Sequence, residues 1–237
     1  MIAFVDLGRK GRLGNRLFQM AATIALAVRN NDDYMFPIWP YEKFFNLHNC
    51  FSNTINTTVN YTEPSFTYTS IPYKPNTNII GYFQSEKYFD DCKDIIHSLL
   101  TPNIHHGIKY GHTSIHVRRG DYTQLRQQYT QLNMGYYQAA MNRIKSPKYI
   151  VFSDDIQWCK TQFKGDRFIF SEGTSEVEDL ALMLACENNI IANSSFSWWG
   201  AWLNKNPSKI VVAPQKWFGP AMPHDTKDLC STDWLRL

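Results

Sequence analysis

The second half of the chain alternates short apolar runs with helical stretches, and this alternation limits the fold more than any other feature. From residue 113 onward the apolar runs lie at 114–117, 149–152, 168–170, 190–192 and 210–213. Four helices are expected between these runs. One covers 134–144, one ends at residue 163, one runs from a Ser175/Glu178 capping box to residue 187, and one covers 198–203. Strands that alternate with helices of this length form βαβ units, whose strands are parallel. The pattern predicts a doubly wound α/β domain over residues 104–237.

The first half starts with one similar unit and then becomes irregular. A strand over 2–7, a glycine-rich turn over 8–15 and an apolar helix over 17–28 follow one another. Glycines let the backbone approach a ligand, and a helix start offers free N–H groups to an anion. A plain turn with a helix cap is the alternative, because the spacing is not Gly-x-Gly-x-x-Gly. Residues 31–78 show no period, which predicts irregular structure with short strands.

A further strand and a turn are expected within residues 79–89, followed by a helix to about residue 100. Pro102 ends that helix and marks a domain boundary after residue 103. The sequence is therefore divided into a first domain over 1–103 and a second over 104–237.

Composition excludes several classes of function. The net charge is +3, from 24 basic and 21 acidic residues, so nothing favours a nucleic-acid partner. No apolar run is long enough to span a bilayer, and the N-terminus lacks the pattern of a secretory signal. Five scattered cysteines without a Cys-x-x-Cys pair predict reduced thiols and no zinc site. We expect a cytoplasmic protein, with peripheral association with a membrane left open.

Polar side chains follow three of the expected strands. His116, Arg118, Arg119 and Asp121 accompany the strand over 114–117. The two other sets are Ser153, Asp154 and Asp155, and Asn193, Ser194, Ser195 and Ser197. Ligands of open α/β sheets bind outside the carboxyl ends of the strands, so the three sets are expected to converge. Paired arginines at such an edge indicate an anionic ligand, a nucleotide or sugar nucleotide, and ion pairs with nearby acids are the alternative.

The chemistry of these groups suggests a role for each. Arginine forks bind diphosphate oxygens, and serine hydroxyls with the N–H groups near Phe196 add neutral donors. A carboxylate of Asp154 or Asp155 can accept hydrogen bonds from guanine, although both could simply cap a helix. Trp198, Trp199 and Trp202 are expected in the core. No cluster has metal-ligand spacing, so the leaving diphosphate would be neutralised without a metal.

Four sequence blocks together resemble a known family. They are residues 11–19 (GRLGNRLFQ), 81–85 (GYFQS), 116–122 (HVRRGDY) and 191–203 (IANSSFSWWGAWL). In this order they are similar to the inverting α-1,2-fucosyltransferases of glycosyltransferase family 11, and more distantly to α-1,6- and protein O-fucosyltransferases. The chain departs from the family in two ways. Arg16 stands where glutamine is usual, and the first half is shorter.

The resemblance implies an α/β fold of GT-B type, with two Rossmann-like domains facing across a cleft. The domain over 1–103 would be the acceptor side, and the domain over 104–237 would hold the sugar nucleotide. The implied reaction moves L-fucose from GDP-fucose to a glycan hydroxyl, galactose O2, with inversion. The implied partners are GDP-fucose as donor substrate and a galactose-containing acceptor, with no cofactor and no metal.

The resemblance also implies roles for individual residues. Arg118 would hold the diphosphate, Arg119 would brace the loop, and Asp121 would fix this arginine loop or bear on catalysis. Asp154 or Asp155 would read guanine. Arg118 and Asp121 are thus the catalytic candidates. The donor-binding candidates are Gly14, Asn15, His116, Arg118, Arg119, Asp154, Asp155, Ser194, Ser195, Phe196 and Ser197.

Three alternatives to this function remain at the level of sequence. An aromatic content of 15% and the Tyr- and Asn-rich middle would also suit a non-catalytic carbohydrate-binding protein. A related transferase could use another sugar nucleotide. The tripeptide Arg119-Gly120-Asp121 matches an adhesion motif, but it follows an apolar strand that is expected to be buried.

Overall fold

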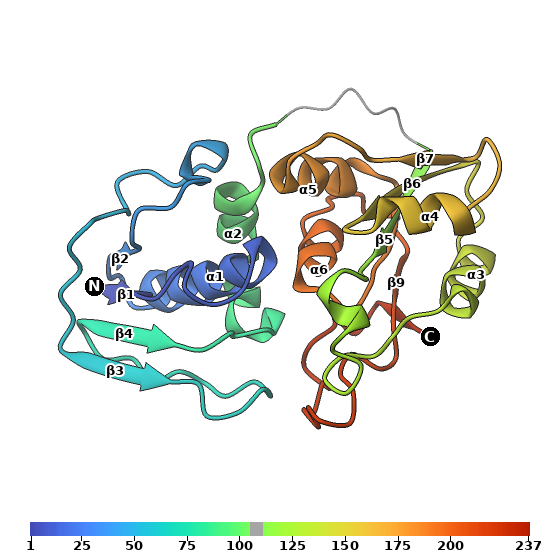
Figure 1. Ribbon diagram of the computed structural model, residues 1–237. Helices are drawn as coiled ribbons and strands as arrows, with labels where there is room; N and C mark the ends of the chain where they lie inside the picture. The colour runs from blue at the N-terminus through green and yellow to red at the C-terminus, as the bar shows by residue number, and fades with distance from the viewer. Residues whose placement is uncertain (105–110) are drawn as a thin grey trace. The chain divides into compact units, whose positions relative to one another are not determined.

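The computed structural model describes residues 1–104 and 111–237. The chain divides into two compact units, Met1–Asn103 with Asp225–Ser231, and Ile104–His224 with Thr232–Leu237 (Figure 1). Asp228 ties its segment to the first unit. Its carboxylate lies 2.5 Å from the Lys87 ammonium group and accepts the Tyr68 N–H at 3.1 Å.

The first unit is built on a parallel sheet with the strand order β2-β1-β4-β3. The strands are β1 (Ile2–Ala3), β2 (Tyr34–Met35), β3 (Val59–Thr62) and β4 (Thr77–Ile80). The helices are α1 (Leu13–Arg29) and α2 (Lys93–Leu100), with the 3₁₀ turns η1 (Glu42–Phe44), η2 (Glu86–Tyr88) and η3 (Asp90–Cys92). Residues 31–78 contain two short strands, one 3₁₀ turn and the first two residues of β4, and are otherwise irregular, as the sequence predicted.

Two boundaries in this unit differ from expectation. β1 ends at Ala3 rather than at residue 7, because the chain turns and Leu7 N–H donates to the Phe4 carbonyl. Gly8 continues this turn with a φ of +91°. α1 starts at Leu13, four residues before the predicted start, so Gly14 and Asn15 lie in its first turn and not in the loop. Burial of Leu13 and Gly14 outweighs the weak helix propensity of Gly and Asn.

The second unit contains a six-stranded parallel sheet with the order β10-β9-β8-β5-β6-β7. Its strands are β5 (His112–Val117), β6 (Lys148–Ser153), β7 (Phe168–Phe170), β8 (Asn188–Ile190), β9 (Val211–Ala213) and β10 (Leu235–Arg236). Counted from β5, the order is 3-2-1-4-5-6, the arrangement of doubly wound dinucleotide-binding sheets. The order reverses between β5 and β8, and this switch point is where such sheets bind ligands.

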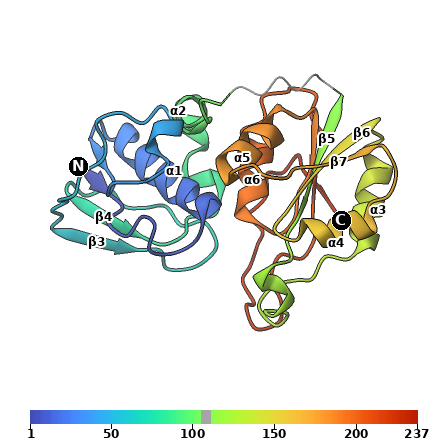
Figure 2. The same ribbon diagram turned by 45° about the horizontal axis from the view of Figure 1, so that its top comes forward.

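Helices cover both faces of this sheet (Figures 1 and 2). They are α3 (Met134–Arg143), α4 (Ile156–Gln162), α5 (Glu176–Ala185) and α6 (Ser195–Trp202), with the 3₁₀ turn η4 (Asp121–Thr123) after β5. Tyr149 and Val151 of β6 pack with α3 and α4, whereas Ile150 and Phe152 pack with α5 and α6. This two-residue alternation explains why the strand is apolar throughout. The predicted doubly wound sheet is confirmed.

The details of this unit match the sequence with small shifts. The Ser175/Glu178 capping box is present at the start of α5. β8 lies two residues earlier than predicted, and β10, which is only two residues long, was not predicted. α6 begins at Ser195 rather than at residue 198, because Ser194 caps it by accepting the Phe196 N–H. Trp198, Trp199 and Trp202 are buried, as expected.

Candidate functional site

The predicted polar sets lie at the carboxyl ends of β8, β5 and β6, which are neighbours in the sheet. Side-chain contacts join them directly. Arg118 Nη1, after β5, lies 2.6 Å from Asp154 Oδ2, after β6. His116 Nδ1, at the end of β5, lies 2.9 Å from Ser197 Oγ, which belongs to the helix after β8. The edge that contains the switch point therefore carries one connected polar network.

Arg118 is the most enclosed cation of this network. Its guanidinium group pairs with both Asp121 and Asp154. Its Cζ also lies 4.9 Å from the centre of the Tyr122 ring, a cation–π contact. The side chain is only 12% exposed, whereas that of Asp121 is 47% exposed. An incoming anion could therefore replace Asp121 as a partner of Arg118, because this exchange leaves the least buried charge without a partner.

Arg119 points to different partners. Its Nε donates to Asp155 Oδ2 at 3.0 Å, and its Cζ lies 3.9 Å from the centre of the Trp158 ring. Its backbone N–H donates to Asp154 Oδ1 at 2.9 Å. These contacts fasten the loop to the first turn of α4. Both arginines are therefore ion-paired, which was the alternative interpretation of the sequence.

The two aspartates after β6 are built into the same loop. Asp155 caps α4 by accepting the Trp158 N–H at 3.2 Å, as its alternative interpretation foresaw. Asp154 lies directly against Gly120, where a Cβ would overlap its carboxylate. A side chain at residue 120 would therefore displace the Asp154 carboxylate. In this structure, both carboxylates for which a contact with guanine was expected bind the arginine loop.

His116 is buried and uncharged. Burial, with a smaller contribution from the Arg118 charge, lowers the pKa of its imidazole from 6.5 to about 3. The ring packs edge-on against Phe196, with 5.5 Å between the ring centres. At neutral pH His116 can offer hydrogen bonds to a ligand or to Ser197, but it adds no positive charge.

Asn193 connects two loops that flank this network. Its amide nitrogen donates to the carbonyl groups of Thr130 and Trp217, at 3.0 and 2.8 Å. Its Oδ1 is buried and accepts no hydrogen bond from the residues that the structure describes. The sequence placed Asn193 among the polar sets, and the structure adds its connecting role.

The sequence did not predict an aromatic group that lies beside Arg118. Tyr122 stacks on Tyr129 with 3.9 Å between ring centres and 5° between planes, and Tyr129 contacts Phe218. Burial is the main cause of the raised pKa of the Tyr122 hydroxyl. Tyr122 closes the HVRRGDY block, which was a signal for its role, but Tyr129 and Phe218 follow no such pattern.

In the first unit, two of the sequence blocks are joined at the end of the sheet. Gln84 Nε2, in the GYFQS block, donates to Asn15 Oδ1 at 2.8 Å. Gln19 Nε2, in α1, donates to the Gly81 carbonyl at 3.1 Å. A Cβ on Gly11, whose φ is +80°, would overlap the Asn15 side chain. Asn15 thus holds the glycine turn against the GYFQS block, while Gly14 is buried in the first turn of α1.

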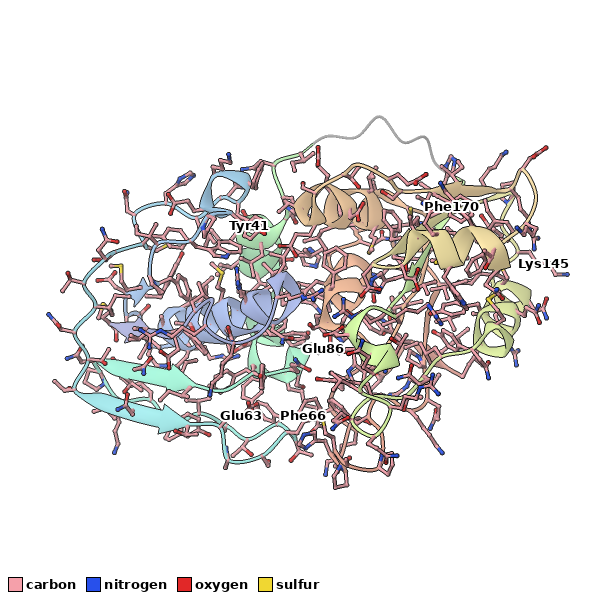
Figure 3. All side chains as sticks on the ribbon, in the orientation of Figure 1. Tyr41, Glu63, Phe66, Glu86, Lys145 and Phe170 are labelled. Atoms are coloured by element: carbon pink, nitrogen blue, oxygen red, sulfur yellow. The ribbon has the colours of Figure 1, made fainter. Side chains whose placement is uncertain are left out.

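Glu63, which the sequence did not single out, lies just beyond β3 (Figure 3). Its carboxylate accepts the backbone N–H groups of Tyr82 at 2.7 Å and of Phe83 at 3.0 Å. Burial raises the pKa of Glu63, and these N–H groups partly oppose that shift. The carboxylate fixes the turn that follows β4.

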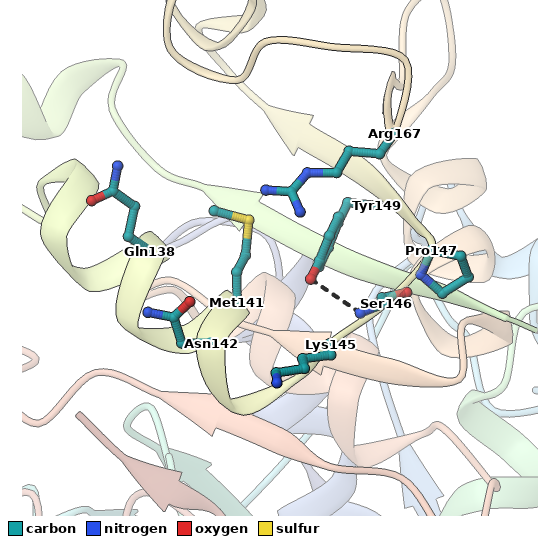
Figure 4. A pocket seen from close by; sticks show the side chains of 8 residues that line it. All are labelled: Gln138, Met141, Asn142, Lys145, Ser146, Pro147, Tyr149 and Arg167. Carbon is teal, nitrogen blue, oxygen red and sulfur yellow. Dashed lines mark hydrogen bonds between the residues drawn. The ribbon is translucent and has the colours of Figure 1, made fainter.

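A separate hollow of about 570 Å³ lies near the amino end of β6, with Lys145 and Arg167 at its rim (Figure 4). The Tyr149 hydroxyl group, on its wall, accepts the Ser146 N–H at 3.2 Å and donates to the Ile144 carbonyl at 2.7 Å. This hollow lies at the opposite end of the strand from the arginine loop.

Within the described residues, no group of three or more His, Cys, Asp or Glu side chains is placed to hold a metal ion. No helix in residues 1–104 or 111–237 is long and apolar enough to cross a membrane. The five cysteines are buried and free.

Comparisons with known proteins agree with one another. The sequence profile described as "Glycosyl transferase family 11" matches residues 45–237. The chain is 30% identical over 285 residues to an alpha-1,2-colitosyltransferase of Escherichia coli, with 96% of each chain covered. It is 35% identical over 184 residues to the O-antigen biosynthesis glycosyltransferase WbnK of Escherichia coli, covering 67% of this chain and 60% of that protein.

A mammalian relative is more distant. The chain is 26% identical over 239 residues to galactoside alpha-(1,2)-fucosyltransferase 1 of Bos taurus, covering 82% of this chain and 64% of that protein. Among solved structures, the fucosyltransferase NodZ from Bradyrhizobium has a TM-score of 0.53 at 13% identity, covering 84% of this chain and 91% of NodZ. That likeness shows a shared α/β fold.

Proposed function

The chain belongs to glycosyl transferase family 11, and on this premise we propose that it transfers L-fucose from GDP-fucose to galactose O2 of a glycan, with inversion. The observation that carries the proposal is the arginine loop at the switch point of the second sheet. Arg118 and the start of α6 flank the place where a nucleotide diphosphate binds in sheets of this order.

In the proposed reaction the acceptor hydroxyl attacks the anomeric carbon from the face opposite to GDP. The bond from that carbon to the diphosphate oxygen breaks, the new glycosidic bond forms, and the hydroxyl proton passes to a base or to water. Arg118 stabilises the charge that develops on the diphosphate. To do so it exchanges its pairing with the exposed Asp121 for the phosphate oxygens.

The remaining donor contacts follow from the neighbouring groups. Ser194, Ser195 and Ser197 provide hydroxyl groups at the start of α6, and Phe196 packs beside His116. Asp154 or Asp155 reads the guanine base. Inosine diphosphate lacks the guanine N2 amino group, so Asp154→Asn and Asp155→Asn can be compared for their preference for GDP over inosine diphosphate. The residue that reads guanine is the one whose asparagine variant loses that preference.

The proposal includes an arrangement of GT-B type. The domain over 1–103 binds the acceptor, the domain over 104–237 binds GDP-fucose, and Gly14 and Asn15 approach the donor from the acceptor side. It also includes a reaction without a metal, which transfer in excess EDTA would test, and a cytoplasmic location, where five unpaired thiols are stable.

The direct test uses the purified protein with GDP-fucose and a set of β-galactosides. We expect GDP release that depends on the acceptor, and NMR of the product should show an α-1,2-linked fucose. Absence of acceptor-dependent GDP release with every galactoside would contradict the proposal.

A second donor is favoured by one finding, the similarity over almost the whole chain to an alpha-1,2-colitosyltransferase. Colitose is the 3-deoxy analogue of L-fucose, so the two donors differ by one hydroxyl group. Competition between GDP-fucose and GDP-colitose in one reaction separates these candidates, because the preferred donor has the higher kcat/KM.

A further inference from the structure

The turn that follows β4 holds an exposed tyrosine in a rigid frame. Tyr82 is 40% exposed, and its side chain makes no hydrogen bond or ring contact with any described residue. Its neighbour Phe83 is fully buried and contacts both Phe4 and Tyr88. The chain therefore places one ring in the core and leaves the adjacent ring exposed.

This turn is fixed at three backbone groups and one side chain. Glu63 accepts the N–H groups of Tyr82 and Phe83, and Gln19 binds the Gly81 carbonyl. Gln84 is bound to Asn15. Phe83 has a φ of +52°, a strained conformation for a bulky residue that persists only where the surroundings enforce it. The backbone that carries the Tyr82 side chain is thus set by the protein before any ligand binds.

An exposed aromatic ring on a rigid turn is suited to one kind of ligand in particular. The C–H bonds at C3, C4 and C5 of galactose lie on one face of the sugar, and this weakly positive face packs on the negative face of an aromatic ring. Little backbone entropy is lost on binding, because the turn is already held. Tyr82 also follows directly after the carboxyl end of β4, the edge at which parallel sheets bind ligands.

We propose that Tyr82 is the residue on which the galactose ring of the acceptor stacks, and that Glu63 positions it by holding the turn. This inference rests on the proposed function, since it names the acceptor contact of that reaction. Tyr82 determines acceptor affinity and leaves the binding of GDP-fucose unchanged.

The test compares Tyr82→Ala, Tyr82→Phe and Tyr82→Trp with the wild type, and it uses Tyr73→Ala as a matched control. Tyr73 belongs to the same unit and is 39% exposed, but it precedes β4 and binds Asp32. We expect Tyr82→Ala to raise the acceptor KM at least 10-fold, whereas Tyr82→Phe and Tyr82→Trp stay within about threefold. The KM for GDP-fucose in donor hydrolysis should stay within twofold for every variant.

An acceptor KM of Tyr82→Ala within twofold of wild type would overturn the inference. An equal loss in Tyr73→Ala, or a parallel loss of donor hydrolysis in Tyr82→Ala, would overturn it as well. Thermal unfolding of each variant confirms that it is folded.

A second measurement separates this inference from the proposed function. Binding of a β-galactoside can be measured without GDP-fucose, from the NMR line broadening of the sugar signals. If the wild type turns over no GDP-fucose but binds the galactoside in a Tyr82-dependent way, the proposed function fails and the sugar site stands. If GDP-fucose is turned over and galactoside binding does not depend on Tyr82, the proposed function stands and the inference about the sugar site fails. If the wild type shows neither, both fail.

Discussion

The carboxyl edges of the two sheets differ sharply in their chemistry. The edge of the second unit carries two arginines and three aspartates in one network around a buried neutral histidine. At the edge of the first unit, the turn after β4 carries one partly buried carboxylate, side-chain amides and an exposed tyrosine, while the turn after β1 carries basic side chains. Charged groups that can exchange partners suit a diphosphate, whereas amides and an exposed ring suit a neutral sugar. This difference supports the proposal that the two units hold different substrates.

The largest expected effect comes from removing the central cation of the charged edge. Arg118→Ala should lower kcat/KM for GDP-fucose by about 100- to 1000-fold, because the diphosphate loses a charge-assisted donor. Arg118→Lys should recover little, since an ammonium group cannot replace the planar fork. Steady-state GDP release measures both variants.

Arg167→Ala is the matched control for this change. Arg167 also lies over an aromatic ring, with its Cζ 4.9 Å from the centre of Phe168, but at the amino end of the strands. Near-wild-type kinetics of Arg118→Ala, or an equal loss in Arg167→Ala, would show that the arginine loop does not hold the diphosphate.

The next effect tests how Glu63 holds the turn after β4. Glu63→Ala removes the acceptor of two backbone N–H groups, which should cost about 2–3 kcal/mol of unfolding free energy. Urea unfolding measures this loss. The acceptor KM should rise while the KM for GDP-fucose is unchanged, because only the turn that carries Tyr82 is loosened. A rise in the KM for GDP-fucose alone would contradict the assignment of donor and acceptor to different edges.

The buried histidine makes stability depend on pH. The pKa of His116 is about 3 in the folded state and about 6.5 when unfolded, so the unfolded state binds more protons between these values. Stability from this residue is complete above pH 6.5 and is lost as the pH falls. Between pH 7 and pH 5 the loss is about 2 kcal/mol.

His116→Asn should remove that slope, which the difference between urea unfolding of the two proteins at pH 7 and pH 5 measures. NMR of the imidazole provides a check that needs no variant, because His116 should remain neutral at pH 5. An imidazole that titrates near pH 6.5 would show that the ring is not buried in solution.

Asp121→Asn should have the smallest effect. Its carboxylate is half-exposed, so loss of the pairing with Arg118 should change the unfolding free energy by less than about 1 kcal/mol. If Asp121 orients Arg118, kcat/KM for GDP-fucose should fall by about 10-fold with an unchanged pH profile. A much larger fall in kcat that also removes the acidic limb of the profile would identify Asp121 as the base instead.

The sequence predicted the second unit well because its strands are buried on both faces. Continuous apolar runs such as 149–152 and a capping box at Ser175 are strong local signals. The strand-end rule then brought His116, Arg118 and Asp154 together across the sheet. Their pairing partners could not be predicted, because the choice of Arg118 between solvent, Asp121 and Asp154 depends on loop geometry.

The first unit was harder to predict because its structure depends on contacts that are distant in sequence. Glu63 reaches Tyr82 and Phe83 across the sheet, and Gln84 reaches Asn15 across 69 residues. The early start of α1 at Leu13 likewise follows from burial, against the local preference of Gly14 and Asn15. Such tertiary effects leave no periodic pattern in the sequence.

Hydrogen–deuterium exchange with each substrate in turn tests the division between the two edges most directly. GDP should slow exchange in peptides that cover residues 116–123, 153–158 and 193–199, while a saturating β-galactoside should slow exchange in peptides that cover residues 81–89. Protection of residues 81–89 by GDP with no change around Arg118 would contradict the assignment of the donor to the arginine loop.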